Sequence, residues 1–593
     1  MTAHEMRWNL HDIVPKGRFE GLFKKAGTGI ERLKSSIDKY SPGMTGQAFR
    51  REMEFNEELM EDLSRLSGYC SLWEATDLKS QDAKLLRSRT DNLFVKYSDA
   101  VIPIHHWLRG LPAGDRPALD DGNARRLFAS FPDLSYVLGH MRSLAVHSLA
   151  PGEERIMSRK RVSGTGALSD LYDVLTDGFQ YRFRPKGRRP QTLNSQEPLR
   201  KHFYSARPSE REAAYRALFE PYGRNLTALF LIYQAIVKDW VSDSQLRKHP
   251  SPVSMRNVHN QVPDAAIGTL LKATEDNAGL FQEFFRLKAG LMKLKRLRRY
   301  DILAPLEEVK KTVPLDRARR LVTDTFRSFS PGFAEKAERV FKAGHIDTHP
   351  RPGKRSGAFC SNVTPKILPY VLLNYTGNSS SVSTMAHELG HAIHDICSSG
   401  HTISAAGTTL PLAETASTIA EIIVFERMLE TARSAREKRA LLMEKMVDAY
   451  STIVRQAYIV KFELEAHRRM GGGVKADDLC QCYLGLLRSH FGSAVEVADE
   501  FRLEWAYIPH IFHTPFYCYA YSFGDLLALA LYSRYRSQGS AFVPKIERIL
   551  AYGSSKSPDD ILKEVGIDMA DRKFWQGSFD ILRGWLDQLR KLG

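Results

Sequence analysis

The sequence predicts a mostly α-helical protein that carries one small β-sheet, and three observations support this fold class. Apolar residues recur at helical spacing: in segment 52–66, Phe55, Leu59 and Leu63 follow one another at intervals of four residues and would form one apolar face. Segments typical of β-strands are few. No internal repeat of about 20–50 residues is present, which argues against a solenoid. We therefore expect a large helical body with a β insert.

The elements that follow along the chain fit this scheme. Pro208 stands at the expected first position of a helix, and segments 421–450 and 580–592 have equally helical patterns. Segment 367–375 is rich in aliphatic and aromatic residues and contains a proline, which is typical of an edge strand. Segment 356–360 is its expected partner strand.

Domain organisation is indicated by one segment. Residues 182–190 are rich in Pro, Gly and Arg and separate two helical regions. We therefore expect an N-terminal helical region over 1–190 and a second region over 191–593.

The composition is that of a globular protein and excludes several classes. Hydrophobic residues make up 43% and charged residues 26% of the 593 residues, as in folded soluble domains. No run approaches the roughly 18 apolar residues of a membrane span, and the first residues lack the apolar core of a secretory signal. Six cysteines are too few for a disulfide scaffold of this size. We expect a cytoplasmic protein that has no membrane partner.

The charge balance is the unusual feature of the composition. With 85 Lys and Arg against 69 Asp and Glu, the formal net charge is +16, which allows a nucleic-acid partner, a membrane surface or acidic ligands. The basic run 293–299 alternates with leucines and is interpreted as the solvated face of a helix. Zinc-finger, RNA-binding and helix-turn-helix signals are missing from the sequence, so we expect no nucleic-acid partner.

One motif indicates metal chemistry. His387, Glu388 and His391 form an HExxH pattern within segment 378–394. On a helix, positions i and i+4 lie one above the other, the separation at which two imidazoles can hold one metal ion. Glu388 can lie beside the metal without binding it and accept a proton from a water molecule. The alternative is an exposed helix face on which two histidines occur by chance.

A third metal ligand is expected from a carboxylate. The position where an extended motif would place a third histidine is Cys397, which leaves a glutamate on a following helix. Glu414 begins such a helix after Pro411, and its small neighbours allow close approach. Glu421 lies two turns further on the same face, where it could accept the ring N–H of a metal-binding histidine. The alternatives are a first-turn glutamate stabilised by the helix dipole and, for Glu421, a solvated residue.

Taken together, these motifs resemble the oligoendopeptidase F and thimet oligopeptidase family of zinc peptidases, with the oligoendopeptidase F branch closer. The resemblance runs from about residue 190 to the end of the chain. It rests on 387–394 and 413–418, and on three further stretches, 299–305, 355–360 together with 369–375, and 508–521.

The resemblance implies a two-lobed helical fold around a deep substrate channel, with the small β-sheet beside the zinc helix and the catalytic region in 191–593. It implies a zinc metalloendopeptidase that hydrolyses internal bonds of short unfolded peptides by way of a zinc-bound water and a glutamate general base. One Zn²⁺ per chain would be held by His387, His391 and Glu414, with Glu388 as the base. The expected partners are short peptides, and the expected state is a monomer or a homodimer.

The resemblance also implies a second catalytic group. His510 and a following tyrosine match residues that bind the substrate and its reacting carbonyl. Tyr517 and Tyr521, seven and eleven residues after His510, would share one helical face and are preferred; Tyr519 is the alternative, as a residue that binds substrate. Core packing of this aromatic cluster is the competing explanation.

The last expectation concerns the substrate backbone. The edge formed by Gly357, Ala358 and Phe359 would hold the peptide as an added strand. Because such a strand is bound through its main-chain hydrogen bonds, we expect loose selectivity for the peptide sequence. Two other functions remain open for the whole chain: an inactive peptidase-like scaffold, and a metallopeptidase that trims carboxyl ends. The sequence leaves open whether the excess positive charge lines the channel.

Overall fold

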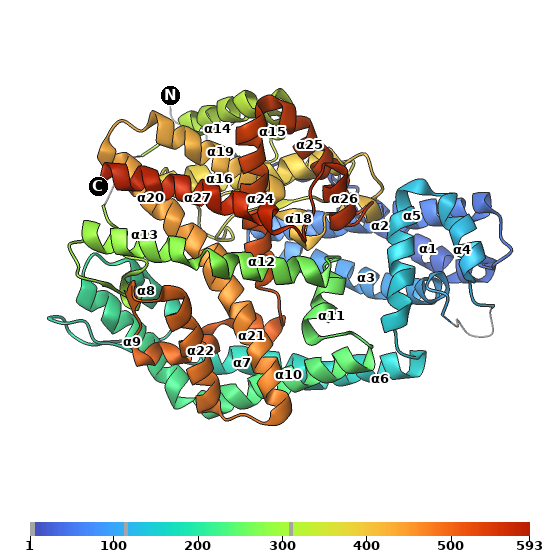
Figure 1. The fold of residues 1–593 in the computed structure, drawn as a ribbon. Helices are drawn as coiled ribbons and strands as arrows, with labels where there is room; N and C mark the ends of the chain where they lie inside the picture. Colours follow the sequence, from blue (N-terminus) through green and yellow to red (C-terminus); the bar gives the residue numbers. More distant parts are fainter. Residues whose placement is uncertain (1–5, 112–116, 308–311) are drawn as a thin grey trace. The chain divides into compact units, whose positions relative to one another are not determined.

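The computed structural model describes residues 6–111, 117–307 and 312–593. Helices make up most of these residues and the sheets are small (Figure 1), which confirms the mostly α-helical class. The chain folds into two compact units that share it in alternating segments. Unit 1 comprises 1–146, 310–427 and 534–566, and unit 2 comprises 147–309, 428–533 and 567–593. The expected division at residue 190 and the expected channel stay predictions.

Unit 1 is built on long amphipathic helices near its N-terminus. Its apolar core includes Phe49, Leu63 and Trp107, which are buried between α1, α2 and α3. The expected helix over 52–66 lies within α2. The helices of this unit are α1 (Phe19–Ser36), α2 (Gly46–Thr76), α3 (Gln81–Leu108), α4 (Asp121–Ala129), α5 (Pro132–Ser143), α14 (Leu315–Phe329), α15 (Pro331–Lys342), α16 (Ser379–Ser398), α17 (Ile403–Ala406), α18 (Leu410–Ala413), the start of α19 (Thr415–Thr431), the end of α24 (Tyr519–Gln538), α25 (Val543–Ala551) and α26 (Pro558–Glu564).

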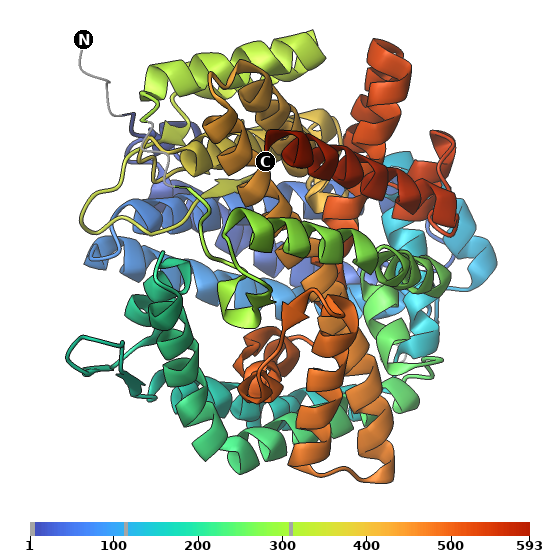
Figure 2. The same cartoon turned by 60° about the vertical axis from the view of Figure 1, so that its left-hand side comes forward.

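Unit 2 contains the second set of helices. Its α21 and α22 lie side by side, as the two orange helices in the rotated view of Figure 2 show. The helix start expected at Pro208 is observed in α9. The helices of this unit are α6 (Pro151–Arg161), α7 (Ala167–Asp177), α8 (Gln196–Arg200), α9 (Pro208–Arg224), α10 (Leu226–Leu246), α11 (Pro252–His259), α12 (Asp264–Asp276), α13 (Ala278–Leu291), α20 (Ala435–Ala449), α21 (Arg455–Gly472), α22 (Ala476–Phe491), the 3₁₀ segment η8 (Asp499–Tyr507), α23 (Pro509–His513), the start of α24 and α27 (Arg572–Leu592).

The largest sheet has three strands in the order β4-β6-β5. β6 (Tyr370–Leu372) is parallel to β4 (Ile346–Asp347) and antiparallel to β5 (Phe359–Ser361), with Cys360 opposite Val371. The expected pairing of the two segments is therefore confirmed. The expectation that 367–375 is an edge strand is wrong, because β6 is the central strand. Its proline precedes the strand, where the missing N–H removes no ladder hydrogen bond.

Two further sheets have two strands each. β1 (Tyr181–Phe183) pairs antiparallel with β2 (Gln191–Leu193), and β3 (Leu297–Arg298) pairs parallel with β7 (Val495–Glu496). The interpretation of 293–299 as a helix face is wrong, since α13 ends at Leu291 and the run then forms β3. Burial explains the difference: Leu297 is fully buried, and Arg299 is 5% exposed because it pairs with a carboxylate inside the unit.

Two expected helical segments differ in extent from those observed. The segment 421–450 is divided between α19 and α20, because α19 ends at Thr431 and the Ser434 side chain caps a new helix by accepting the Glu437 N–H. The segment 580–592 lies inside the longer α27. Among the described residues, no helix is both long and apolar enough to cross a bilayer.

The three-stranded sheet positions the HExxH helix. Both β5 and β6 pack on α16, whose buried face includes Met385, Leu389 and Ile393. This arrangement confirms the expected small sheet beside that helix. It also leaves β5, at the edge of the sheet, next to the side of α16 that carries the polar motif.

Candidate active site

Helix α16 places the two histidines of the motif on one face. The helix begins after Asn378, whose side-chain oxygen accepts the Ser381 N–H at 2.8 Å and so satisfies one of the free donors of the first turn. His387 and His391 are one turn apart, and their ring centroids are 4.8 Å apart. The two imidazoles meet edge-on, with an angle of 84° between their planes, and lie on one face of the helix as expected.

A close contact between α16 and α19 sets the position of the third candidate ligand. A Cβ atom built on Gly390 would lie 2.5 Å from Ser417 Cα and 2.7 Å from the Ala416 carbonyl oxygen. Only glycine fits this contact, because real Cβ atoms do not approach backbone so closely. The small residues after Glu414 thus permit the close approach that their size predicts.

Glu414 lies between α18 and α19 and faces both histidines. Its Oε2 atom is 3.4 Å from His387 Nε2 and 3.4 Å from His391 Nε2. The Ser417 hydroxyl donates a hydrogen bond to the same oxygen at 2.8 Å. One ligand atom from each of the three residues lies within 4.8 Å of the others, and no other set of His, Cys, Asp and Glu in the described residues forms such a group.

The donors of this cluster fit a metal ion. Two imidazole nitrogens and one carboxylate oxygen are a donor set of catalytic zinc sites. Glu421 Oε2 lies 3.4 Å from His387 Nδ1, as expected, and so would direct the other ring nitrogen of His387 toward the cluster. Burial lowers the pKa of His387, but Glu421, Glu414 and Glu388 outweigh it and raise that pKa to about 9. Several carboxylates around two imidazoles create the negative potential that a divalent cation needs.

Glu388 is buried beside the cluster. Only 7% of the residue is exposed. Burial raises the pKa of its carboxyl group, while the charges of His387 and His391 lower it in part. The backbone N–H of Cys360 on β5 also lowers this pKa, which places the strand next to the carboxyl group. The motif predicts where Glu388 lies, but not this contact with β5.

The candidate substrate edge lies at the start of β5. Gly357 has a φ of +81°, a left-handed conformation that favours glycine, and Ala358 and Phe359 follow it into the strand. The Asn374 side-chain amide donates to the Gly357 carbonyl oxygen at 2.7 Å. A pocket of about 300 Å³ is lined by Gly357, Ala358 and the first turn of α16. That this edge binds a peptide stays a prediction.

In unit 2, the structure brings His510 together with Tyr517 and Tyr521. The Tyr521 hydroxyl lies 3.2 Å from His510 Nε2. The Tyr517 ring stacks on His510 with centroids 6.1 Å apart and meets Tyr521 edge-on at 5.3 Å. Burial, together with the positive charge of Arg455, lowers the pKa of His510, so its imidazole is neutral at neutral pH.

Tyr519 has different surroundings from the other two tyrosines. Its side chain is fully buried, and its hydroxyl accepts a hydrogen bond from the Asn260 side-chain amide at 2.7 Å. Burial raises the pKa of this hydroxyl well above its usual range. The hydroxyl is already engaged inside unit 2, which argues against the substrate contact predicted for Tyr519.

Buried polar groups that the sequence did not indicate hold the segment before Tyr517. Phe516 has a φ of +59°, a conformation that is strained for a bulky residue. Its N–H donates to Glu463 Oε1 at 2.7 Å, and Arg256 Nε donates to the Pro515 carbonyl oxygen at 3.0 Å. Glu463 and Arg256 belong to α21 and α11, so no local sequence pattern links them to this segment.

Comparison with known proteins identifies the family. The model of peptidase family M3 matches residues 202–581. Bacillus subtilis oligopeptidase PepF is 22% identical, over 99% of this chain and 87% of that protein. A Borreliella burgdorferi oligoendopeptidase F homolog is 24% identical, over 99% of this chain and 98% of that protein.

Solved structures agree with this assignment at the level of the fold. The crystal structure of a Chlamydophila abortus protein superposes with a TM-score of 0.88 at 22% identity, over 99% of this chain and 98% of that one. Oligoendopeptidase F from Enterococcus faecium superposes with a TM-score of 0.70 at 20% identity, over 97% of this chain and 98% of that one. The resemblance expected from the motifs is thus confirmed, because the sequence similarity to an oligoendopeptidase F homolog extends over 99% of this chain. The chain belongs to peptidase family M3.

Proposed function

We propose that this peptidase is a zinc-dependent oligoendopeptidase, which hydrolyses internal bonds of short unfolded peptides. The observation that carries the proposal is the group formed by His387, His391 and Glu414, whose ligand atoms lie within 4.8 Å of one another, with the buried Glu388 beside it. Family membership supports peptide hydrolysis. The donor set supports zinc.

The three residues of this group would hold one zinc ion per chain. When bound, zinc activates a water molecule and polarises the scissile carbonyl. Glu421 would keep His387 in the tautomer that leaves Nε2 free to bind the metal. Ser417, which donates to Glu414 at 2.8 Å, would fix the carboxylate on the side of the two imidazoles.

Glu388 would carry the proton chemistry. It accepts a proton from the attacking water and delivers it to the amine of the leaving product. Its position supports this role: it directly follows His387 on α16, it is shielded from bulk water, and β5 lies beside it. A group held in this way needs little reorganisation during the reaction.

His510 with Tyr517 and Tyr521 would bind the reacting carbonyl of the substrate. A hydrogen-bond donor aimed at the developing oxyanion is typically worth about 3 kcal/mol. The neutral His510 and the two phenol groups around it can each donate such a bond. The edge at Gly357, Ala358 and Phe359 would hold the peptide backbone as an added strand, so that selectivity for side chains is loose.

The remaining parts of the proposal concern the setting of the enzyme. We place it in the cytoplasm, as a monomer or homodimer that acts on peptides and has no nucleic-acid partner, with its catalytic region in 191–593. A gel shift at physiological ionic strength tests the last exclusion: binding that weakens steeply with salt would contradict it.

Hydrolysis of a blocked fluorogenic peptide tests the function itself. We expect cleavage at internal bonds, detected by mass spectrometry of the products, and we expect a chelator to abolish it and zinc to restore it. Cleavage confined to the carboxyl end of unblocked peptides would favour a trimming enzyme. Lack of hydrolysis of any peptide by the zinc-loaded protein would favour an inactive scaffold.

A further inference from the structure

A pocket of about 760 Å³ in unit 2 has His510 in its wall. Its interior is lined by the side chains of Tyr172, Tyr181 and Tyr222, which are buried, and by Arg455 at the start of α21. The pocket is therefore large enough for an amino-acid side chain or a peptide end. Its position next to His510 connects it to the carbonyl-binding group proposed above.

The interior of this pocket carries an excess positive charge. Arg299 and Arg455 both donate to one carboxylate oxygen, Glu504 Oε1, at 2.8 Å and 3.2 Å. Glu504 is only 3% exposed, so two guanidinium groups share one buried negative charge. The nearby Tyr450 and Tyr483 do not neutralise the charge of the second guanidinium, because burial raises the pKa of both phenols and keeps them uncharged.

Arg455 is the member of the pair that reaches the pocket. Its side chain is 24% exposed, whereas that of Arg299 is 5% exposed. Among the described residues, Glu504 is the only hydrogen-bond acceptor that the Arg455 guanidinium contacts. Its remaining N–H groups can therefore bind a ligand, and a guanidinium forms two parallel hydrogen bonds with a carboxylate.

The other charges of the pocket lie at its rim. Asp173, Asp177, Glu197 and Arg200 are all exposed. Glu197 pairs with Arg200 at 3.2 Å, and Asp173 pairs with His513 at 3.0 Å. Water and salt screen exposed charges far more than buried ones, so Arg455 dominates the potential inside the pocket.

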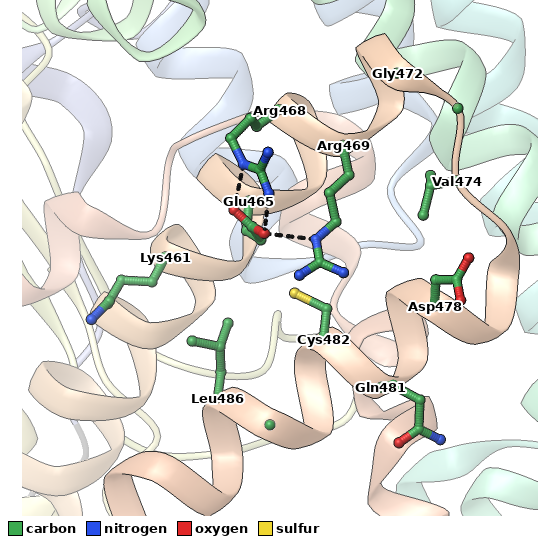
Figure 3. Close-up of a pocket in the computed structure, with 12 residues that line it drawn as sticks. Lys461, Glu465, Arg468, Arg469, Gly472, Val474, Asp478, Gln481, Cys482 and Leu486 are labelled. Carbon is green, nitrogen blue, oxygen red and sulfur yellow. Dashed lines mark hydrogen bonds and ion pairs between the residues drawn. The ribbon is translucent and has the colours of Figure 1, made fainter.

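A second basic pocket, of about 930 Å³ between α21 and α22, provides a contrast (Figure 3). There Arg468 and Arg469 also share one carboxylate, that of Glu465, at 2.6 Å and 2.7 Å. Their side chains are 69% and 37% exposed, so solvent screens their charge. The least exposed cation of this pocket, Lys461, has its own carboxylate partner in Glu275 at 2.7 Å, so we make no proposal for this pocket.

We propose that Arg455 binds a carboxylate of the substrate peptide in the pocket beside His510, and that it makes the enzyme select peptides that carry this group. The carboxylate can be an acidic side chain or the free carboxyl end. Its charge would balance the second guanidinium beside Glu504, at a site where the low dielectric strengthens the interaction. The inference rests on the proposed peptidase function and adds a substrate class to it.

Four peptides that share one internal cleavage site test this inference. Two carry Glu and two carry Gln within three residues of the scissile bond, and each pair has one free and one amidated carboxyl end. For the wild-type enzyme we expect a KM about tenfold lower for the peptide that carries the bound carboxylate, either Glu or the free carboxyl end, than for its neutral partner. The Glu–Gln comparison and the acid–amide comparison separate the two sources.

Substitutions at Arg455 test whether this residue causes the preference in KM. Arg455→Met should remove the difference in KM between the preferred peptide and its neutral partner, and it leaves Arg299 and Glu504 as a pair of opposite charges. Arg455→Lys keeps the charge without the planar fork and should retain part of the preference. Arg469→Met, the matched substitution on the same helix, should retain all of it.

The outcomes separate this inference from the proposed function. If the wild-type enzyme cleaves all four peptides with the same KM, the inference is overturned while the peptidase function stands. A preference that persists in Arg455→Met, or a kcat that falls equally for all four peptides, also overturns it, because Arg455 would then act only on the structure. If no peptide is cleaved, the proposed function fails and the inference fails with it.

Discussion

Two polar clusters of this protein, the group around His387 in unit 1 and the group around His510 in unit 2, are held in different ways. In unit 1, His387 and His391 lie on α16 and Glu414 directly precedes α19, and these two helices touch backbone to backbone, with room only for glycine at position 390. In unit 2, His510 meets Tyr517 and Tyr521 at a segment whose strained Phe516 is held by the buried side chain of Glu463.

This difference shows how far local sequence can specify a site. The group in unit 1 uses helical periodicity and small residues, which a short stretch of sequence encodes. The group in unit 2 depends on Glu463 and Arg256, which come from distant helices and are buried polar groups whose hydrogen bonds matter because no water replaces them. The predictions that follow test each cluster against a matched control.

Within this comparison of the two clusters, the largest effect is expected from the tyrosines of unit 2. Tyr517→Phe and Tyr521→Phe each remove a hydroxyl next to His510, and kcat should fall by about 10²–10³-fold for a donor to the oxyanion. The measurement is steady-state kinetics with one peptide. Tyr535→Phe on α24, the helix that carries Tyr521, should retain full activity, because its ring packs on Phe329. A large loss in Tyr519→Phe alone would move the assignment to that residue.

The helix contact of unit 1 should be broken by a single methyl group. Gly390→Ala places a Cβ 2.5 Å from Ser417 Cα, and overpacking of this kind costs about 1–3 kcal/mol of unfolding free energy. We expect a lower Tm and weaker zinc retention. Gly27→Ala on α1, where a Cβ meets nothing within 4 Å, should leave stability equal or higher by up to about 1 kcal/mol. Equal Tm values for Gly390→Ala and wild type would contradict the account of this contact.

A smaller effect is expected when the orientation of one ligand is loosened. Glu421→Gln weakens the contact with His387 Nδ1, seen at 3.4 Å, and should reduce zinc affinity about 10–100-fold. Competition with a chromophoric chelator measures this affinity. Glu430→Gln on the same helix, at an exposed position, serves as the control. An affinity equal to that of wild type would show that Glu421 does not orient His387.

The smallest effect concerns the pH dependence of unit 2. Burial raises the pKa of Glu463 from 4.5 to about 8, against the lowering effects of the Phe516 N–H and Arg256. The folded protein therefore keeps a proton that the unfolded chain loses above about pH 4.5, and stability falls as pH rises toward 8, by about 1.4 kcal/mol per pH unit. Glu463→Gln removes this dependence. Denaturant unfolding at pH 6 and pH 7 should show it in the difference between the two proteins, and parallel profiles would contradict it.

The sequence predicts the group in unit 1 closely. The helix around His387, the position of Glu414 before a helix of small residues and the contact with Glu421 all follow from spacing along regular helices. The pairing of β5 with β6 is also predicted correctly, because both segments have extended patterns. The central position of β6 is missed, since its second partner β4 has only two residues and no strand signal.

Other features could not be predicted because their causes are tertiary. Phe516 adopts a left-handed conformation without the Gly or Asn that would signal it. The run 293–299 has a helical charge pattern, but burial of Leu297 and of the Arg299 guanidinium draws it into β3. Arg455 looks like an ordinary helix residue, and its importance emerges only where it and Arg299 meet Glu504.

Metal content and turnover, measured together on the wild type and on Glu388→Gln, test the central claim most directly. We expect one zinc per chain by elemental analysis in both proteins, and a loss of peptide hydrolysis in Glu388→Gln of about 10²–10⁴-fold, because only the proton-transfer group has been changed. A Glu414→Ala protein, which lacks a ligand, should lose the zinc as well. A wild-type enzyme that is active without a stoichiometric metal, or a Glu388→Gln enzyme as active as its parent, would contradict the account.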